Sequence, residues 1–233
     1  MSARPRQGGK LPAGNHSFSR EFVVRSQRER MLDAVARAVA AKGYDKASVA
    51  DVLGLAGVSR RTFYEQFTGK EDCFLVAYQT IFSDLLGASW SAYLSRRRWP
   101  DRIAAGLEAF VAPLAAEPAY ARAGIIEVLA AGPRAFELRD SLLRGFYPVF
   151  DSRRPEVPDH GAPRIVAEAT VGGIYEVIYR HIVAHGPQTL LGLMPELTYL
   201  ALAPFIGSRA AHRAARLDAC RSGRSGAVGA ELE

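Results

Sequence analysis

The sequence predicts an all-α protein, with a three-helix helix-turn-helix domain at its N-terminus and a larger helical domain after it. Apolar residues recur at helical spacing through most of the 233 residues, and no stretch shows convincing strand alternation. Serine-led capping patterns and glycines mark short helices in the first third, and prolines divide the remainder into further helices. The expected parts are a basic, partly disordered arm (1–25), a helix-turn-helix domain (26–74), a helical effector-binding and dimerisation domain (75–218) and a flexible tail (219–233).

The first expected helix begins at a capping box formed by Ser26 and Glu29 and ends at Gly43. The second begins at Ser48, where Asp51 completes another capping box. A turn around Gly57 leads to a third helix capped by a second serine. Two short helices joined by a glycine-containing turn form a helix-turn-helix unit.

Further helices are expected after residue 70, and the sequence shows no internal repeats. Prolines and a Pro/Gly-rich loop separate them. The expected ranges are 71–95, 100–117, 118–131, 133–150, 164–184 and 195–217, the last with a kink at Pro204.

Positive charge is concentrated in the first third of the chain. Residues 1–70 carry 13 Lys/Arg against 6 Asp/Glu, whereas residues 71–233 carry 17 against 18. Codon bias explains the choice of arginine over lysine but not this clustering. An anionic partner such as nucleic acid is therefore expected at the N-terminal end.

Other compositional features favour a cytoplasmic protein. Two cysteines, Cys73 and Cys220, are too few for a disulfide framework. The first 30 residues are polar and basic, unlike a signal peptide. The apolar run 187–208 is interrupted by prolines and a glutamate, so we interpret it as buried protein surface and expect no membrane span.

The outer face of the third helix offers hydrogen-bonding groups suited to DNA. Phe63 is expected to face inward, which places the polar residues around it on the outside. Arginine can bridge guanine O6 and N7, glutamine can bridge adenine, and a threonine methyl group can contact thymine. Glu65 either accepts a hydrogen bond from cytosine or pairs with the arginine one turn earlier. The predicted DNA-binding residues are Ser48, Ser59, Arg60, Arg61, Thr62, Tyr64, Gln66 and Lys70.

The segment RERMLDAVARAVAAKGYDKASVADVLGLAGVSRRTFYEQFTGKEDCF (28–74) closely resembles the N-terminal domain of the tetracycline-repressor (TetR) family of bacterial transcriptional regulators. The resemblance implies that Arg60, Arg61 and Thr62 face base edges and that Tyr64 and Lys70 hold phosphates, with the capping serines as phosphate-binding caps. It also implies a helical C-terminal domain whose last two helices pair with a second subunit. The basic arm is longer than in many members, and either enters the minor groove or serves as a solubilising tail.

Two features of the C-terminal part suggest a homodimer with an internal ligand site. The 164–184 helix is apolar on more than one face, so either a second subunit covers it or it is fully buried within its own domain. The predicted interface residues are Ile174, Ile178, Leu197, Leu200 and Ala201. The resemblance implies a pocket for a small apolar or aromatic effector, and the alternative is that these aromatics only fill the core. The predicted pocket residues are Trp90, Phe110, Tyr120, Phe136, Phe146, Tyr175 and Tyr179.

No cofactor, metal or catalytic activity is expected. His181 and His185 have the spacing of a zinc pair but lack a third ligand. Cys73 reads as a core thiol, with a redox switch as the alternative. We therefore expect a homodimeric transcriptional regulator, more readily a repressor, released from palindromic double-stranded DNA when an effector shifts the fourth helix. The alternatives are a constitutive DNA-binding dimer without a ligand, and a small-molecule-binding protein or enzyme with a vestigial helix-turn-helix.

Overall fold

The computed structural model describes residues 20–151 and 163–216, and within these ranges the regular structure is entirely helical. The fold class predicted from the sequence is therefore confirmed. Expectations for the first 19 residues, for most of the Pro/Gly-rich loop, and for the C-terminal tail with Cys220 fall outside the described residues.

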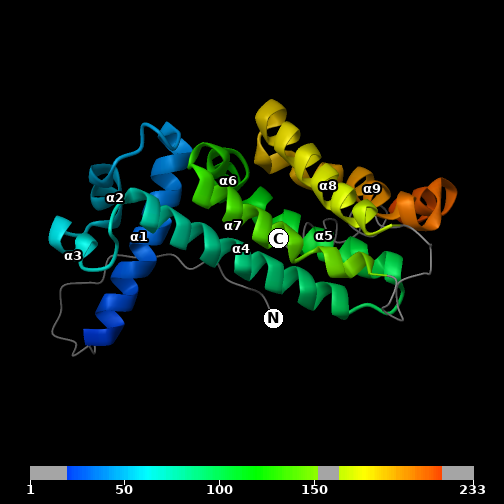
Figure 1. The fold of residues 1–233 in the computed structure, drawn as a ribbon, viewed down its shortest axis with the longest axis horizontal. Helices are drawn as coiled ribbons and strands as arrows, with labels where there is room; N and C mark the ends of the chain where they lie inside the picture. Colours follow the sequence, from blue (N-terminus) through cyan, green and yellow to red (C-terminus); the bar gives the residue numbers. More distant parts are fainter. Residues whose placement is uncertain (1–19, 152–162, 217–233) are drawn as a thin grey trace, which may run out of the picture.

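The N-terminal helices form one end of an elongated molecule (Figure 1). They are α1 (Arg20–Lys42), α2 (Val49–Ala56) and α3 (Arg60–Tyr64). From this end α4 (Lys70–Leu94) runs along the length of the molecule and packs against α1 near its start (Figure 1). The predicted start of the first helix at Ser26 was wrong, because α1 begins six residues earlier, with Glu21 in its first turn. An acidic residue near a helix N-terminus stabilises it, and a capping-box pattern inside a helix has no effect on where the helix begins.

The remaining helices build the C-terminal domain. They are α5 (Trp99–Ala116), α6 (Pro118–Ala121), the π-helix η1 (Arg122–Ile126), the 3-10 helix η2 (Glu127–Ala130), α7 (Pro133–Arg144), η3 (Tyr147–Phe150), α8 (Arg164–His185), η4 (Pro187–Leu193) and α9 (Met194–Ile206). Another helix covers 208–216. In Figure 1, α8 and α9 lie together on the side of the molecule away from α4.

Three of the expected C-terminal helices are interrupted. The 118–131 segment is not one α-helix, because it passes through η1 and η2. The expected 133–150 helix ends at Gly145. The backbone of this glycine lies so close to Leu86 that an added Cβ would lie 2.7 Å from the Cδ2 atom of Leu86. The expected 195–217 helix is interrupted at Gly207, whose φ is 79°, whereas α9 continues through Pro204, and the kink expected there stays a prediction. Positive φ is accessible to glycine at little cost.

Two apolar clusters form the core. One joins α1, α2 and α3 to α4 and to the η1–η2 region, and the other lies between α5, α8 and α9. The run Pro187–Ile206 is long and apolar enough to cross a membrane by length and composition alone. Here it forms η4 and α9, which contact α5 and α8, and Leu197 and Leu202 within it are fully buried. The inward face of the run is therefore buried against the protein, although only 39% of the run is buried.

Candidate nucleic-acid interface and ligand cavity

The start of α2 is fixed by the capping box expected from the sequence. The Ser48 hydroxyl accepts a hydrogen bond from the Asp51 N–H (3.3 Å), and the Asp51 carboxylate accepts one from the Ser48 N–H (3.0 Å). The ammonium group of Lys42 lies 2.6 Å from the same carboxylate. Hydrogen bonds from Lys42 and then from Ser48 lower the pKa of Asp51 to about 2. The end of α1 is thereby tied to the beginning of α2.

The helix α3 is short, and its orientation is set at its N-terminal end and by one buried side chain. Gly57 adopts φ 62° and its N–H bonds to the carbonyl of Leu53, which ends α2. The Ser59 hydroxyl then caps α3 by accepting from the Thr62 N–H at 3.0 Å. Phe63 is fully buried beneath it. These contacts fix the face of α3 that is turned outward.

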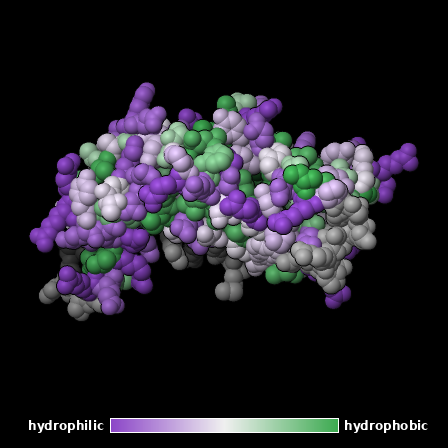
Figure 2. Space-filling model, viewed as in Figure 1, coloured by the Kyte–Doolittle hydropathy of each residue, from purple (hydrophilic) through white to green (hydrophobic). Residues whose placement is uncertain are grey.

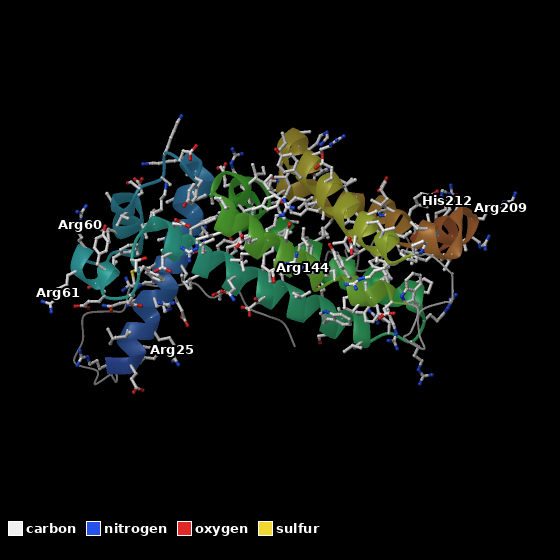
Figure 3. All side chains as sticks on the ribbon, in the orientation of Figure 1. Arg25, Arg60, Arg61, Arg144, Arg209 and His212 are labelled. Carbon is white, nitrogen blue, oxygen red and sulfur yellow. The ribbon has the colours of Figure 1, made fainter. Side chains whose placement is uncertain are left out.

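The outward face carries the arginines expected from the sequence. Arg60 and Arg61 are exposed and extend away from the body of the molecule (Figure 3), and the Tyr64 side chain is 50% exposed. Arg61 Nε donates to the Glu65 carboxylate at 2.9 Å, which is the pairing alternative considered for Glu65. Because both side chains are exposed, this ion pair is weak and Arg61 remains available to exchange it for a base.

Two predicted DNA-binding residues are placed differently. The outward placement of Gln66 was wrong: α3 ends at Tyr64, and the Gln66 amide oxygen is buried without a hydrogen-bond partner among the described residues. The Lys70 ammonium donates to the carbonyl of Tyr44 (2.6 Å) and lies 4.2 Å from the centre of its ring. Lys70 thus secures the turn between α1 and α2, and its contact with phosphate stays a prediction.

Two further arginines have structural roles that could not be predicted from the sequence. Arg30 donates to the carbonyl of Ala56 at 2.6 Å, at the end of α2, and Arg28 lies over the ring of Phe67 at 4.6 Å. Both partners are distant in sequence, so only the fold reveals these contacts. The surface at this end of the molecule is still predominantly hydrophilic on the face drawn in Figure 2.

A cavity lies in the C-terminal domain between α4, α5, α7, α8 and α9. It encloses about 690 Å³ including its open mouth, and the atoms exposed on its wall are all apolar. Four predicted pocket residues line it: Trp90, Phe110, Phe146 and Tyr175. A site of this character favours an apolar ligand.

The other three aromatics were wrongly predicted to line this pocket. Tyr120 lies near α1, where its hydroxyl donates to the Asp33 carboxylate at 2.6 Å. Phe136 is 49% exposed on α7, under the guanidinium group of Arg139. Tyr179, one turn beyond Tyr175 on α8, is not among the lining residues. For Tyr179, helical periodicity could not distinguish the cavity side of the helix from the other sides, because α8 is apolar on several faces.

Three of the five predicted interface residues are interior. Ile178, Leu197 and Ala201 are at most 1% exposed, so no second subunit can reach them on this surface. Only Ile174 and Leu200 remain partly exposed. The apolar residues that α8 does present to solvent are Ile165 and Val183, which are 64% and 60% exposed.

The structure also shows the surroundings of the two histidines considered for metal binding and of the cysteine considered as a redox switch. The rings of His181 and His185 lie 4.8 Å apart, and within residues 20–151 and 163–216 no cluster of three or more metal-ligating side chains occurs. Cys73 is buried, its thiol faces the carbonyl of Met31, and desolvation raises its pKa to about 12.

Comparison with known proteins identifies the N-terminal part. The family model described as bacterial regulatory proteins, tetR family, matches residues 31–77, from α1 into α4. The transcriptional activator FasR of Mycolicibacterium smegmatis is 27% identical over 105 residues, which are 45% of this chain and 48% of FasR. The match thus spans about half the length of this curated relative.

Solved structures share the whole fold at low sequence identity. The fatty acid degradation regulator FadR of Bacillus halodurans is 18% identical, with a TM-score of 0.67 over 76% of this chain and 94% of that chain. FadR of Bacillus subtilis, solved with stearoyl-CoA, is 17% identical, with a TM-score of 0.67 over 76% of this chain and 98% of its own. Residues 31–77, which carry the capped helix-turn-helix, thus match the tetR family of bacterial regulatory proteins, and the chain shares its fold with the two FadR regulators.

Proposed function

We propose that the protein is a homodimeric, sequence-specific DNA-binding regulator whose affinity for a palindromic operator changes when an apolar ligand fills the C-terminal cavity. The observation that carries the proposal is the outward presentation of Arg60, Arg61 and Tyr64 on a helix whose N-terminus is capped and whose opposite face is anchored by the buried Phe63. A rigid, polar helix face that protrudes from a basic domain suits the major groove. In a dimer, the two recognition helices would enter successive major grooves of the DNA.

The cavity supports a ligand of fatty-acyl type. Its wall is apolar and aromatic, and FadR of Bacillus subtilis, which has the same fold, was solved in complex with stearoyl-CoA. An elongated alkyl chain gains from such a wall through the hydrophobic effect, whereas a polar ligand would lose its hydration without compensation. A constitutive dimer with no ligand is less well supported, because a protein without a ligand has no need of this space.

The experiment that tests DNA recognition is selection of bound duplexes from a random pool by the purified protein. A palindrome is expected to emerge. Arg61→Ala should then relax the preference at one position of each half-site, at a cost of about 1 to 3 kcal/mol for the preferred base. Tyr64→Ala should weaken binding to all sequences alike, since a phosphate contact carries no base information.

Arg209→Ala is the matched control, because Arg209 is an exposed arginine at the opposite end of the molecule (Figure 3). It should leave the selected sequence and its affinity unchanged. If the wild-type protein enriches no sequence even at low salt, the proposal of DNA recognition fails.

Repression is the direction of regulation that we propose, with the ligand releasing the operator. FasR is described as an activator, so the opposite sign has a precedent in a relative. Transcription from a promoter that contains the selected operator, measured in vitro with and without the protein, decides the sign. An increase in transcript on addition of the protein would replace repression by activation.

A further inference from the structure

One segment of the chain bridges the cavity and the helix-turn-helix. The η1–η2 segment (122–130) contacts α8, which forms part of the cavity wall, and also contacts α1. Figure 1 shows α6, which leads directly into this segment, beside α1. The segment therefore touches both functional parts of the molecule.

On the cavity side, the contact is made by Tyr175. Its ring lines the cavity, and its hydroxyl donates to the carbonyl of Ile125, the fourth residue of the π-helix, at 2.7 Å. The guanidinium group of Arg139 lies 4.9 Å from the centre of the same ring. A ligand that fills the cavity against α8 would have to displace this ring or press on it.

On the DNA-binding side, the contact is made by Glu127, two residues after Ile125. Its carboxylate accepts a hydrogen bond from the backbone N–H of Tyr44 at 2.9 Å, and its side chain is only 12% exposed. Tyr44 follows Gly43 in the turn between α1 and α2, and its carbonyl binds Lys70 from the start of α4. The amide–carboxylate bond thus joins η2 to the turn that positions α2.

The segment between these two contacts includes the π-helix η1, whose backbone hydrogen-bonding pattern can rearrange. A π-helix carries one residue more per turn than an α-helix, and single π-turns occur frequently at functional sites. Its other side is fixed, because the backbone of Gly124 rests on the ring of Phe82, where a Cβ would lie 2.1 Å from the ring. A displacement at Ile125 has little room on the side of Phe82, and Glu127 follows Ile125 by only two residues.

We propose that the η1–η2 segment is the element that couples the cavity to the DNA-binding end, with Tyr175 and Glu127 as its positioning residues. An apolar ligand that moves the Tyr175 ring breaks the bond to Ile125, and Glu127 then moves away from the Tyr44 N–H. The turn between α1 and α2 is released, and the recognition helix changes its position. This inference rests on the proposed function, and it locates in η1–η2 a connection from the cavity to the turn between α1 and α2.

The first test needs neither DNA nor ligand. Hydrogen exchange at the Tyr44 amide is compared in the wild type and in Tyr175→Phe, which removes only a hydroxyl that bonds to Ile125. Exchange at Tyr44 should accelerate about fivefold or more, while amides of α5 keep their wild-type rates. Tyr179→Phe, a matched loss of a hydroxyl one turn away on α8, should have no effect. Unchanged exchange at Tyr44 in Tyr175→Phe would overturn the coupling.

The second test measures switching, with stearoyl-CoA as the probe and the selected operator as the DNA. Glu127→Ala should reduce the probe-induced change in operator affinity about fivefold or more, and Glu127→Gln, which retains an acceptor for the Tyr44 N–H, should restore most of it. Wild-type switching in Glu127→Ala would contradict the proposal. If the wild type binds no operator or ignores the probe, the proposed function fails instead, and the exchange experiment still decides the coupling.

Discussion

Arg61 and Phe63 lie two positions apart in α3 and illustrate what single residues contribute. Phe63 is fully buried and sets the rotation of the helix, and Arg61 is consequently turned to solvent. Both placements could be predicted from the sequence, because a 100° turn per residue separates the two faces. Gln66 could not be placed in this way, since α3 ends before it and the periodicity no longer applies.

Cys73 should be chemically inert in the folded protein. Burial raises its thiol pKa to about 12, so the reactive thiolate is nearly absent at neutral pH. In a Cys220→Ser variant, a thiol reagent such as Ellman's reagent should react only as fast as the protein unfolds. Adding urea should therefore accelerate the reaction. Complete labelling within minutes in buffer would revive the redox-switch alternative for this thiol.

At the scale of helices, local signals predicted the structure where the stabilising contacts are themselves local. The capping serines of α2 and α3 and the glycine between them act within four residues, and the structure confirms all three. The break at η1 depends instead on Gly124 meeting Phe82, which is 42 positions away and on another helix. The bond between Glu127 and Tyr44 is equally non-local. Such contacts leave no periodic signal, so sequence analysis missed both.

Asp51 should make the start of α2 sensitive to acid. Its pKa in the folded protein is about 2, below the ordinary 3.8, so its stabilising effect is complete above about pH 4 and is lost as the pH falls towards 2. Asp51→Asn should lower the thermal midpoint at pH 6, and the difference from wild type should shrink on acidification. Asp45→Asn, at an exposed position in the preceding turn, is the control. A pH-independent difference would argue against this charge effect.

Gly124→Ala should destabilise the protein, because the added methyl group collides with the Phe82 ring. A loss of about 1 to 3 kcal/mol is expected from chemical denaturation. Gly87→Ala in α4 is the matched control, since nothing lies within 4 Å of its added methyl group, and it should be neutral or stabilising. Phe82→Leu should reduce the penalty of Gly124→Ala. Equal stability of the two alanine variants would mean that the ring moves aside freely.

At the scale of the whole molecule, the cavity and the dimer surface compete for the same helices. Ile174 and Ile178 of α8 both line the cavity, so they cannot also form an exposed interface core. The sequence revealed that α8 is apolar on several faces but not which face is turned inward, because that depends on how α5 and α9 pack around it. The outward positions, among them Ile165, Gly172 and Val183, are the ones left for a second subunit.

Gly172→Arg should therefore shift the protein from dimer to monomer. Gly172 is exposed midway along α8, and nothing lies within 4 Å of its Cβ position, so the protomer itself tolerates a side chain there. A bulky charge at the centre of an interface opposes association. Sedimentation equilibrium of this variant is compared with Glu108→Arg on α5, which should remain dimeric. A dimeric Gly172→Arg protein would place the interface on another surface.

The basic residues that hold the N-terminal helices together have a consequence for the ionic strength at which the protein can work. Arg28, Arg30, Lys42 and Lys70 each bind a group of the protein itself. Lys42 is neutralised by Asp51, and the other three side chains are held in place by the fold, so they can displace counterions condensed on DNA only where the fold directs them towards a phosphate. The slope of log K against log salt concentration, about −0.9 for each phosphate neutralised, should be markedly shallower than the 13 basic residues of 1–70 suggest. The affinity for an operator would then survive changes in cellular salt that dissociate a protein held mainly by charge.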